Sequence, residues 1–166
     1  LPVPKNLTNA CGASATQATV VEQQYDTAGR VVGAYAYTAQ LTVDASLSTA
    51  LSQGSATEAS LSTWLSANRS TAQIQRMVYD AAGRVAYSID GAGAVTSTRY
   101  NALGMVASVR QHAQALTLNL NGTTLDATQV ASALVETAQD RVDYNVYDSA
   151  ARVVFRVHAD ASTEEI

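Results

Sequence analysis

The chain has 166 residues, of which 47% are hydrophobic and 14% are charged, and its formal net charge at pH 7 is −4. Lys5 is the single lysine and the remaining basic residues form no stripe that could neutralise phosphates, so we expect no nucleic-acid partner. No apolar run approaches the roughly 18 to 20 residues that a membrane-spanning helix needs, so we expect no membrane span.

A heptapeptide punctuates the chain. It reads YDTAGRV at residues 25–31, YDAAGRV at 79–85, YNALGMV at 100–106 and YDSAARV at 147–153. Residues 1–24, ahead of the first copy, are predicted to form an N-terminal segment and a lead-in strand. Repetition of one short sequence predicts repetition of one local shape.

The heptapeptide has the composition of a tight hairpin turn. Its tyrosine ends the incoming strand, the Asp or Asn side chain accepts hydrogen bonds from the backbone just ahead, and Gly takes a position that needs a positive φ. This spacing suits a three-to-five-residue loop with a β-bulge. The residues assigned to this structural repeat are Tyr25, Asp26, Gly29, Arg30, Tyr79, Asp80, Gly83, Arg84, Tyr100, Asn101, Gly104, Tyr147, Asp148 and Arg152.

Two copies depart from the pattern. Ala151 stands where the other copies have Gly, and a left-handed Ala costs on the order of 1 kcal/mol. Either that turn changes type or it is strained. Met105 replaces the arginine of the third copy, so the arginine is not indispensable to the turn.

Residues 79–99 are predicted to be a plain hairpin. Val85, Tyr87 and Ile89 alternate with small or polar residues, which is the period of a strand. The run Gly-Ala-Gly at 91–93 marks the next reversal of the chain.

Residues 44–68 and 126–139 are predicted to be helical inserts. Leu61, Trp64 and Leu65 form an apolar stripe in the first insert. Ser55-x-x-Glu58 and Asp126-x-x-Gln129 each resemble a capping box at a helix start. Short helices rich in Ser and Thr are marginal alone, so we expect them to dock on the apolar face of the sheet.

These elements predict an α+β fold, an antiparallel β-hairpin repeat sheet with short helical inserts packed on one face. The chain is predicted to divide into two tandem copies. The first covers residues 25–99, and the second covers residues 100–166 and closes with a truncated hairpin at 147–166.

No motif in the sequence anchors a reaction. The G-x-S-x-G, Walker-type and H-E-x-x-H patterns are absent from the sequence. His112 and His158 lie in different copies without a second ligand at a fixed spacing, so we expect no metal site. Arg30, Arg84 and Arg152 are expected to pair with a neighbouring Asp or to stack on a Tyr of the adjacent strand. We expect no catalytic residue, no cofactor and no enzymatic activity.

The heptapeptide, repeated at a step of 21 residues from Tyr79 to Tyr100, resembles the YD-repeat, or RHS-repeat, family. The resemblance covers residues 25 to 160, although helical inserts interrupt the family's continuous pattern. It implies a long bacterial protein, secreted or held at the cell surface, whose hairpins stack into a sheet. In related proteins that sheet can spiral into a shell that encloses a toxin, and carbohydrate binding is attributed to the family.

Two functions are compatible with these observations. The first is a non-catalytic structural repeat segment of a shell or stalk, with neighbouring repeats of the parent chain as its partners. The alternative is a binding module in which exposed Tyr35, Tyr37 and Tyr87 stack on a glycan or a protein partner. Strands near residues 19–25 and 153–158 are expected to present unpaired backbone and to support self-association.

Overall fold

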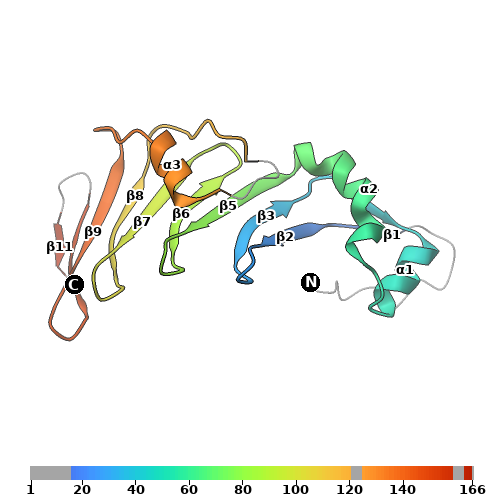
Figure 1. Ribbon diagram of the computed structural model, residues 1–166, viewed down its shortest axis with the longest axis horizontal. Coiled ribbons are helices and arrows are strands. Elements are labelled where there is room, and N and C mark those ends of the chain that lie inside the picture. Colours follow the sequence, from blue (N-terminus) through green and yellow to red (C-terminus); the bar gives the residue numbers. More distant parts are fainter. Residues whose placement is uncertain (1–15, 121–124, 159–162, 166) are drawn as a thin grey trace. The chain divides into compact units, whose positions relative to one another are not determined.

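The computed structural model describes residues 16–120, 125–158 and 163–165 (Figure 1). The parts of the predicted segments 1–24 and 147–166 that fall outside these ranges are not described. The helices are α1 (Ala45–Ser52), α2 (Glu58–Asn68) and α3 (Ala127–Ala133), and a 3₁₀ turn spans Arg69–Thr71. The strands are β1 (Thr16–Ala18), β2 (Val21–Tyr25), β3 (Val31–Ala36), β4 (Leu41–Val43), β5 (Gln73–Tyr79), β6 (Val85–Asp90), β7 (Val95–Tyr100), β8 (Val106–Gln111), β9 (Arg141–Tyr147), β10 (Val153–Val157) and β11 (Thr163–Glu165).

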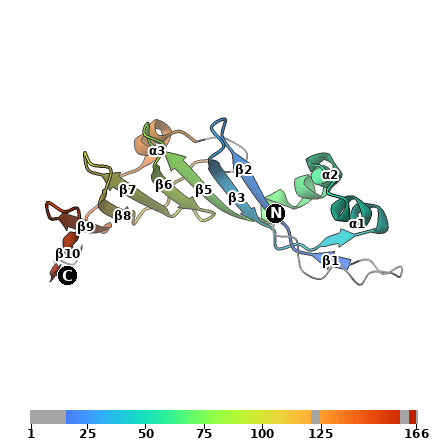
Figure 2. The same ribbon diagram turned by 90° about the horizontal axis from the view of Figure 1, so that it is seen from below.

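Within the described ranges the strands form two sheets. Nine strands make one sheet in the order β11-β10-β9-β8-β7-β6-β5-β3-β2, and β1 pairs with β4 in the other. The ladders from β5 to β11 are antiparallel, and consecutive strands lie side by side there (Figure 2). Together with the short helices, this arrangement confirms the predicted α+β class and the antiparallel hairpin sheet.

Close contacts divide the chain into two units. The first unit holds α1, α2 and the small β1–β4 sheet, and the second holds the repeated hairpins and α3. Among the described residues, the first unit covers 16–22 and 35–73, and the second covers 23–34, 74–120, 125–158 and 163–165. The division into repeat copies at residues 25–99 and 100–166 stays a prediction.

One turn geometry recurs at every copy of the heptapeptide. Between β5 and β6, Asp80 Oδ1 accepts hydrogen bonds of 2.9 Å from the backbone N–H groups of Ala82 and Arg84. The Asp80 N–H donates to the Arg84 carbonyl at 2.8 Å, and the Gly83 N–H donates to the Asp80 carbonyl at 2.9 Å. Gly83 has a φ of 78°, and the ladder shifts register just before the turn. The predicted bulged hairpin turn is confirmed.

The turn is kept where the sequence departs from the pattern. Asn101 uses its side-chain oxygen as Asp80 does, accepting from the N–H groups of Leu103 and Met105 at 3.0 Å. Ala151 adopts a φ of 62° in the last copy, and its N–H donates to the Asp148 carbonyl. Of the two outcomes predicted for this alanine, the structure shows the strained turn of unchanged type.

A fifth turn of the same geometry follows β6. Asp90 Oδ1 accepts from the N–H groups of Ala92 and Ala94 at 2.9 Å, and Gly93 has a φ of 84°. This turn has neither the tyrosine nor the arginine of the heptapeptide. The turn itself therefore forms without the tyrosine and the arginine, and these two residues serve another purpose.

The first predicted insert forms two helices in the first unit. Asp44 Oδ1 accepts from the Leu47 N–H at 2.8 Å and begins α1. The chain then breaks at Gly54, which has a φ of 66°. In α2 the predicted apolar stripe is confirmed, with Leu65 buried and Trp64 half-buried.

The start of α2 differs from the prediction. The capping box was expected at Ser55 and Glu58, but Thr57 is the N-cap and its N–H donates to Ser60 Oγ at 3.2 Å. Ser55 cannot serve because both its N–H and its hydroxyl donate to the Ala50 carbonyl at the end of α1. Ser55 therefore caps the C-terminal end of α1 and does not cap the start of α2.

The second insert contains a shorter helix than the predicted 126–139. Its start is confirmed, since Asp126 Oδ1 accepts from the Gln129 N–H at 2.8 Å and Gln129 Oε1 accepts from the Asp126 N–H at 3.1 Å. The helix ends at Ala133, because Leu134 turns to an extended backbone with a ψ of 137°. The residues that follow make polar contacts with the sheet instead.

The main core of the second unit lies between α3 and the sheet. The helix rests against β6, and residues 116–120 cover the neighbouring strands (Figure 1). Burying one aliphatic side chain of this kind stabilises a fold by about 1.5–3 kcal/mol. The buried cluster consists of Val78, Ile89, Val95, Leu116, Leu120 and Val130.

The predicted open edge at residues 153–158 was wrong. β10 pairs with β11, with Phe155 opposite Glu165 and Val157 opposite Thr163. The backbone of β10 is therefore hydrogen-bonded on both sides, and β11 is the terminal strand of the sheet, with β2 at the other end. No described helix is long and apolar enough to cross a membrane.

Candidate functional site

Each repeated arginine pairs with the aspartate of its own turn. The backbone N–H of the arginine, followed by its side chain, lowers the pKa of the Asp80 and Asp148 carboxyl groups below the usual 3.8. This confirms one of the two contacts predicted for these arginines. The Nε–Oδ2 distances lie between 2.7 and 2.8 Å in the pairs Arg30–Asp26, Arg84–Asp80 and Arg152–Asp148.

Arg84 also contacts the tyrosine of the next heptapeptide, Tyr100. Its guanidinium carbon lies 4.2 Å from the ring centroid of Tyr100. The Tyr100 hydroxyl donates to the carbonyl of Val85, the residue after the arginine, at 3.0 Å. We call this double contact, from one heptapeptide to the next, a turn latch. It joins β6 to β7, and thereby the hairpin β5–β6, closed by the Asp80 turn, to the hairpin β7–β8, closed by the Asn101 turn.

The same turn latch joins β3 to β5. The guanidinium carbon of Arg30 lies 4.5 Å from the Tyr79 ring centroid, and the Tyr79 hydroxyl donates to the Val31 carbonyl at 2.7 Å. The predicted stacking of Arg30 and Arg84 on a tyrosine of the adjacent strand is confirmed.

Between β8 and β9 the latch is partial. The Tyr147 hydroxyl donates to the Val106 carbonyl at 2.8 Å, but Met105 occupies the arginine position. Among the described residues, two further repeat side chains make no latch. Tyr25 is 57% exposed, and the Arg152 side chain is 78% exposed.

Two of the three predicted ligand-stacking tyrosines are buried, so their predicted exposure was wrong. Tyr35 is fully buried, with the Arg69 guanidinium 4.8 Å from its ring. The Tyr37 hydroxyl donates to Glu22 at 2.6 Å, its ring lies 5.1 Å from that of Trp64, and burial raises its pKa to about 12. Trp64 of α2 and Arg69, the residue after α2, cover these two rings.

Tyr87, the third predicted stacking residue, is half-buried and lines a cavity of about 390 Å³. The wall on the α3 side is apolar, and the wall on the sheet side carries polar and charged groups. The cavity is lined by Ala127 and Ala131 of α3, by Leu134 and Glu136 just after α3, and on the sheet side by Ser97, Arg99 and His112.

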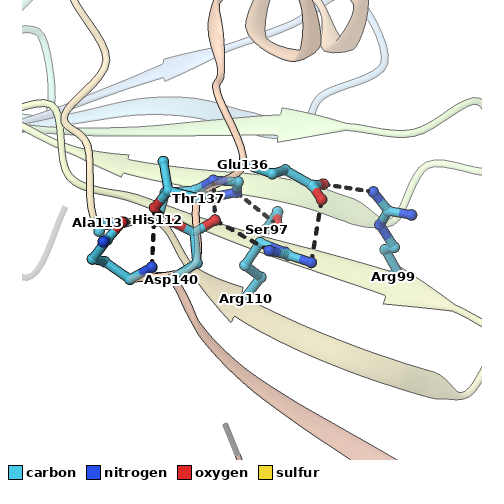
Figure 3. Close-up of polar contacts among 9 residues, drawn as sticks. Ser97, Arg99, Arg110, His112, Ala113, Glu136, Thr137 and Asp140 are labelled. Atoms are coloured by element: carbon cyan, nitrogen blue, oxygen red, sulfur yellow. Dashed lines mark hydrogen bonds and ion pairs between the residues drawn. The ribbon is translucent and has the colours of Figure 1, made fainter.

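Beside this cavity Ser97, His112 and Asp140 form a connected row (Figure 3). Ser97 Oγ lies 3.0 Å from His112 Nε2, and His112 Nδ1 lies 3.5 Å from Asp140 Oδ2. Strand register explains the first contact: Ser97 pairs with Arg110, and the His112 N–H donates to the Val95 carbonyl at 2.9 Å. The histidine therefore lies diagonally across from the serine on one face of the sheet.

Asp140 is held as an anion. Its side chain is fully buried and accepts hydrogen bonds from the Ala113 N–H at 3.0 Å, the Thr137 hydroxyl at 2.9 Å and Arg110 at 3.1 Å. The Ala113 N–H, followed by the two side-chain donors, holds the pKa of this carboxyl well below 3.8. The extended segment after α3 thereby ties itself to the end of β8.

His112 is held in its neutral form. Its side chain is 3% exposed, and this burial lowers its pKa below 6.5. Asp140 opposes that shift, while the nearby Arg110 adds to it. Burial is the largest of these effects, so the pKa of His112 lies below 6.5 and the imidazole is neutral at pH 7.

Two arginines share Glu136 at the edge of the cavity. Arg99 lies 3.1 Å from Glu136 Oε1 and Arg110 lies 3.2 Å from Oε2 (Figure 3). The Arg99–Glu136 pair is largely exposed, so it adds little stability, but it fixes charge beside Ser97.

Ser97 and Asp140 were not singled out from the sequence, and His112 was considered only as a metal ligand. The three residues are separated by 15 and 28 positions, so no local motif marks them. The usable signal was the register of β7 and β8, which the turn at Asn101 determines. The described residues contain no group of three or more His, Cys, Asp or Glu that could hold a metal ion.

No protein-family model and no curated protein matches this chain. Among solved structures it is similar to a chain in the crystal structure of TcdB2-TccC3-Cdc42, with 14% identity and a TM-score of 0.40. The match covers 89% of this chain and 7% of that chain, so the present chain spans a small part of the protein it matches.

Proposed function

We propose that this chain is a structural segment of a larger bacterial protein of the YD-repeat type, secreted or held at the cell surface. Its hairpins would stack side by side as part of a shell or stalk, with neighbouring repeats of the parent chain as partners. The turn latch is the observation that carries the proposal, because the same residues make the same contact from one hairpin to the next. This role requires no catalytic residue and no cofactor.

The latch supports the role by setting strand register. A slip of one residue would turn every side chain of a strand to the opposite face of the sheet. The tyrosine hydroxyl reaches one carbonyl only, directly after the turn of the neighbouring hairpin. Each latch therefore aligns a new hairpin on the previous one, at the end of the strands where the register shift occurs.

Hydrogen–deuterium exchange on a Tyr100→Phe variant tests this role. The substitution removes the hydroxyl and keeps the ring, so exchange should speed up in β6 and β7. Tyr25→Phe is the matched control, since Tyr25 makes no latch, and it should leave exchange in the same strands unchanged. Equal effects of the two variants, or no effect of Tyr100→Phe, would contradict the scaffold role of the latch.

The proposed location has its own test. Protease added to intact bacteria that produce the full-length protein should cleave it, because a secreted or surface protein is accessible from outside. Cleavage confined to lysed cells would place the protein elsewhere.

A second candidate function, glycan binding, depends on Tyr87. It is the one predicted stacking tyrosine that lines a cavity, and polar groups of Ser97 and Glu136 face the same space. A glycan array probed with the wild-type chain and with Tyr87→Leu would support this function if binding appeared and was lost in the variant. Absence of binding by the folded wild-type chain would exclude it.

A further inference from the structure

The row Ser97–His112–Asp140 has the order and contacts of a nucleophile, a base and a residue that orients the base. A hydroxyl lies within hydrogen-bonding distance of an imidazole nitrogen, and a buried carboxylate faces the other nitrogen. The imidazole-carboxylate distance of 3.5 Å is longer than a full hydrogen bond, as is common before a substrate is bound. Such a row is recognised by geometry and not by sequence order or fold.

The charge on Asp140 favours one histidine tautomer. His112 Nδ1 is buried and makes no hydrogen bond, but the ionised carboxylate 3.5 Å away would repel a lone pair on that nitrogen, which favours the tautomer with the proton on Nδ1. In that tautomer the lone pair of Nε2 is directed at Ser97, and the Ser97 hydroxyl donates to it. This is the tautomer that a base needs in order to take a proton from serine.

The cavity beside the row gives a substrate room. Ser97 and His112 both line it, and its volume of about 390 Å³ lies in the range of small-molecule sites. The apolar wall of Ala127, Ala131 and Leu134 suits a short acyl chain. Arg99 is two residues from Ser97 on the same strand face and lines the same cavity. Glu136 contacts one nitrogen of its guanidinium, and the other N–H groups of that guanidinium remain as donors for a developing oxyanion.

We propose that Ser97 is a nucleophile, activated by His112, that takes the acyl group of small carboxylic esters entering this cavity. The proposal goes beyond the scaffold role and does not depend on it. Ser97 Oγ attacks the ester carbonyl carbon while its proton passes to His112 Nε2. The bond from that carbon to the alkoxy oxygen then breaks, and the imidazolium returns the proton to the departing oxygen. An alcohol leaves and an acyl-serine remains.

Water completes the cycle. It adds to the acyl carbon as His112 takes its proton, the bond to Ser97 Oγ breaks, and the serine recovers a proton from the imidazolium. The carboxylic acid departs, and no oxidant or reductant is needed. Asp140 stays ionised throughout and orients the imidazole, which makes it a positioning residue.

A fluorophosphonate probe tests the nucleophile directly. Attack by Ser97 Oγ forms a bond to phosphorus, fluoride leaves, and His112 takes the serine proton. Mass spectrometry of the folded wild-type chain should show one adduct, on Ser97. No adduct, or an adduct on another residue, would overturn the proposal whatever the behaviour of any variant.

Substitutions distinguish a serine that His112 activates from a serine that is only accessible to the probe. Ser97→Ala should abolish labelling and the hydrolysis of p-nitrophenyl acetate, and His112→Gln should slow both by about 100-fold or more. Ser108→Ala is the matched control, because Ser108 lies on the neighbouring strand at the same 8% exposure and opposite Arg99. It should leave both rates unchanged. An equal loss in Ser108→Ala, or an unchanged rate in His112→Gln, would contradict activation by histidine.

The pH profile gives a further readout. Labelling of the wild type should fall only below pH 6.5, as His112 becomes protonated. The residual labelling of His112→Gln should show no such fall below pH 6.5. A wild-type profile that rises with pH as hydroxide does, with no inflection, would show an unassisted serine and overturn the proposal. Circular dichroism of each variant confirms that the comparison is between folded chains.

Discussion

Arg84 and Tyr100 contact each other across two neighbouring strands, with the guanidinium carbon 4.2 Å from the ring centroid. The Tyr100 hydroxyl meanwhile donates to the carbonyl that follows Arg84 in the chain. The fifth turn, at Asp90, forms without either residue type, so this contact is not part of turn formation. The contact instead joins neighbouring hairpins, which explains why arginine and tyrosine recur together in the heptapeptide.

The partial latch at Tyr147 can be completed by substitution. Met105→Arg should place a guanidinium over the Tyr147 ring, because Arg84 reaches Tyr100 from the equivalent position. We expect stabilisation by about 0.5–1 kcal/mol, the usual contribution of an exposed cation–π contact. Urea denaturation measures it, and the gain should vanish in a Tyr147→Leu background. A gain that persists there would come from some other contact.

The last turn can be relieved of strain. Ala151→Gly should stabilise the protein by about 1 kcal/mol, because glycine adopts a positive φ without the steric cost that Ala151 bears at 62°. The reverse substitution, Gly29→Ala, should cost a similar amount, because an added Cβ has no atom within 4 Å there. Thermal unfolding of the pair provides the check, and destabilisation by Ala151→Gly would show that this φ is not strained.

Two left-handed glycines should respond differently to alanine. At Gly29 an added Cβ has no atom within 4 Å, whereas at Gly93 it would lie 2.5 Å from the Leu116 carbonyl oxygen. Both variants bear the left-handed strain, but Gly93→Ala must also push back the segment that covers the core. We expect it to be less stable than Gly29→Ala by about 1–3 kcal/mol, the range of overpacked sites. Equal denaturation midpoints for the two variants would contradict the close approach.

Stability should depend on pH through His112. Its folded-state pKa is lowered by burial, so the unfolded chain binds the proton more tightly. The free energy of unfolding should therefore be largest above pH 6.5 and fall as the pH drops below that value. The charged groups that face this imidazole are Asp140, Arg110, Glu136 and Arg99. Denaturation at pH 7.5 and pH 5.5 tests the sign, and His112→Gln should reduce the difference.

The hairpin turns could be predicted from the sequence because their hydrogen bonds join residues that are close together in the chain. The Asp or Asn side chain defines each turn within five residues, so the hairpins and their bulges could be predicted. For Ala151 the strained turn was one of the two predicted outcomes. Burial of Tyr35 and Tyr37 could not, because the atoms that cover them come from residues 22, 64 and 69.

The candidate site required long-range information for the same reason. Ser97 meets His112 only through the pairing of β7 with β8, and Asp140 reaches them only because α3 ends early and the chain returns along the sheet. A helix continued to residue 139 would have carried Asp140 elsewhere. The apolar pattern predicted a helix that was too long. Residues 136–140 leave the helix and make polar contacts with the sheet instead.

The most direct test of the account is a double-mutant cycle on Arg84 and Tyr100, using Arg84→Met and Tyr100→Leu singly and together. If the latch couples neighbouring hairpins, the double variant should lose less unfolding free energy than the sum of the losses in the two single variants. The expected difference is about 0.5–1 kcal/mol. Additive losses would mean that the arginine and the tyrosine act independently, and the claim that they join one hairpin to the next would fail.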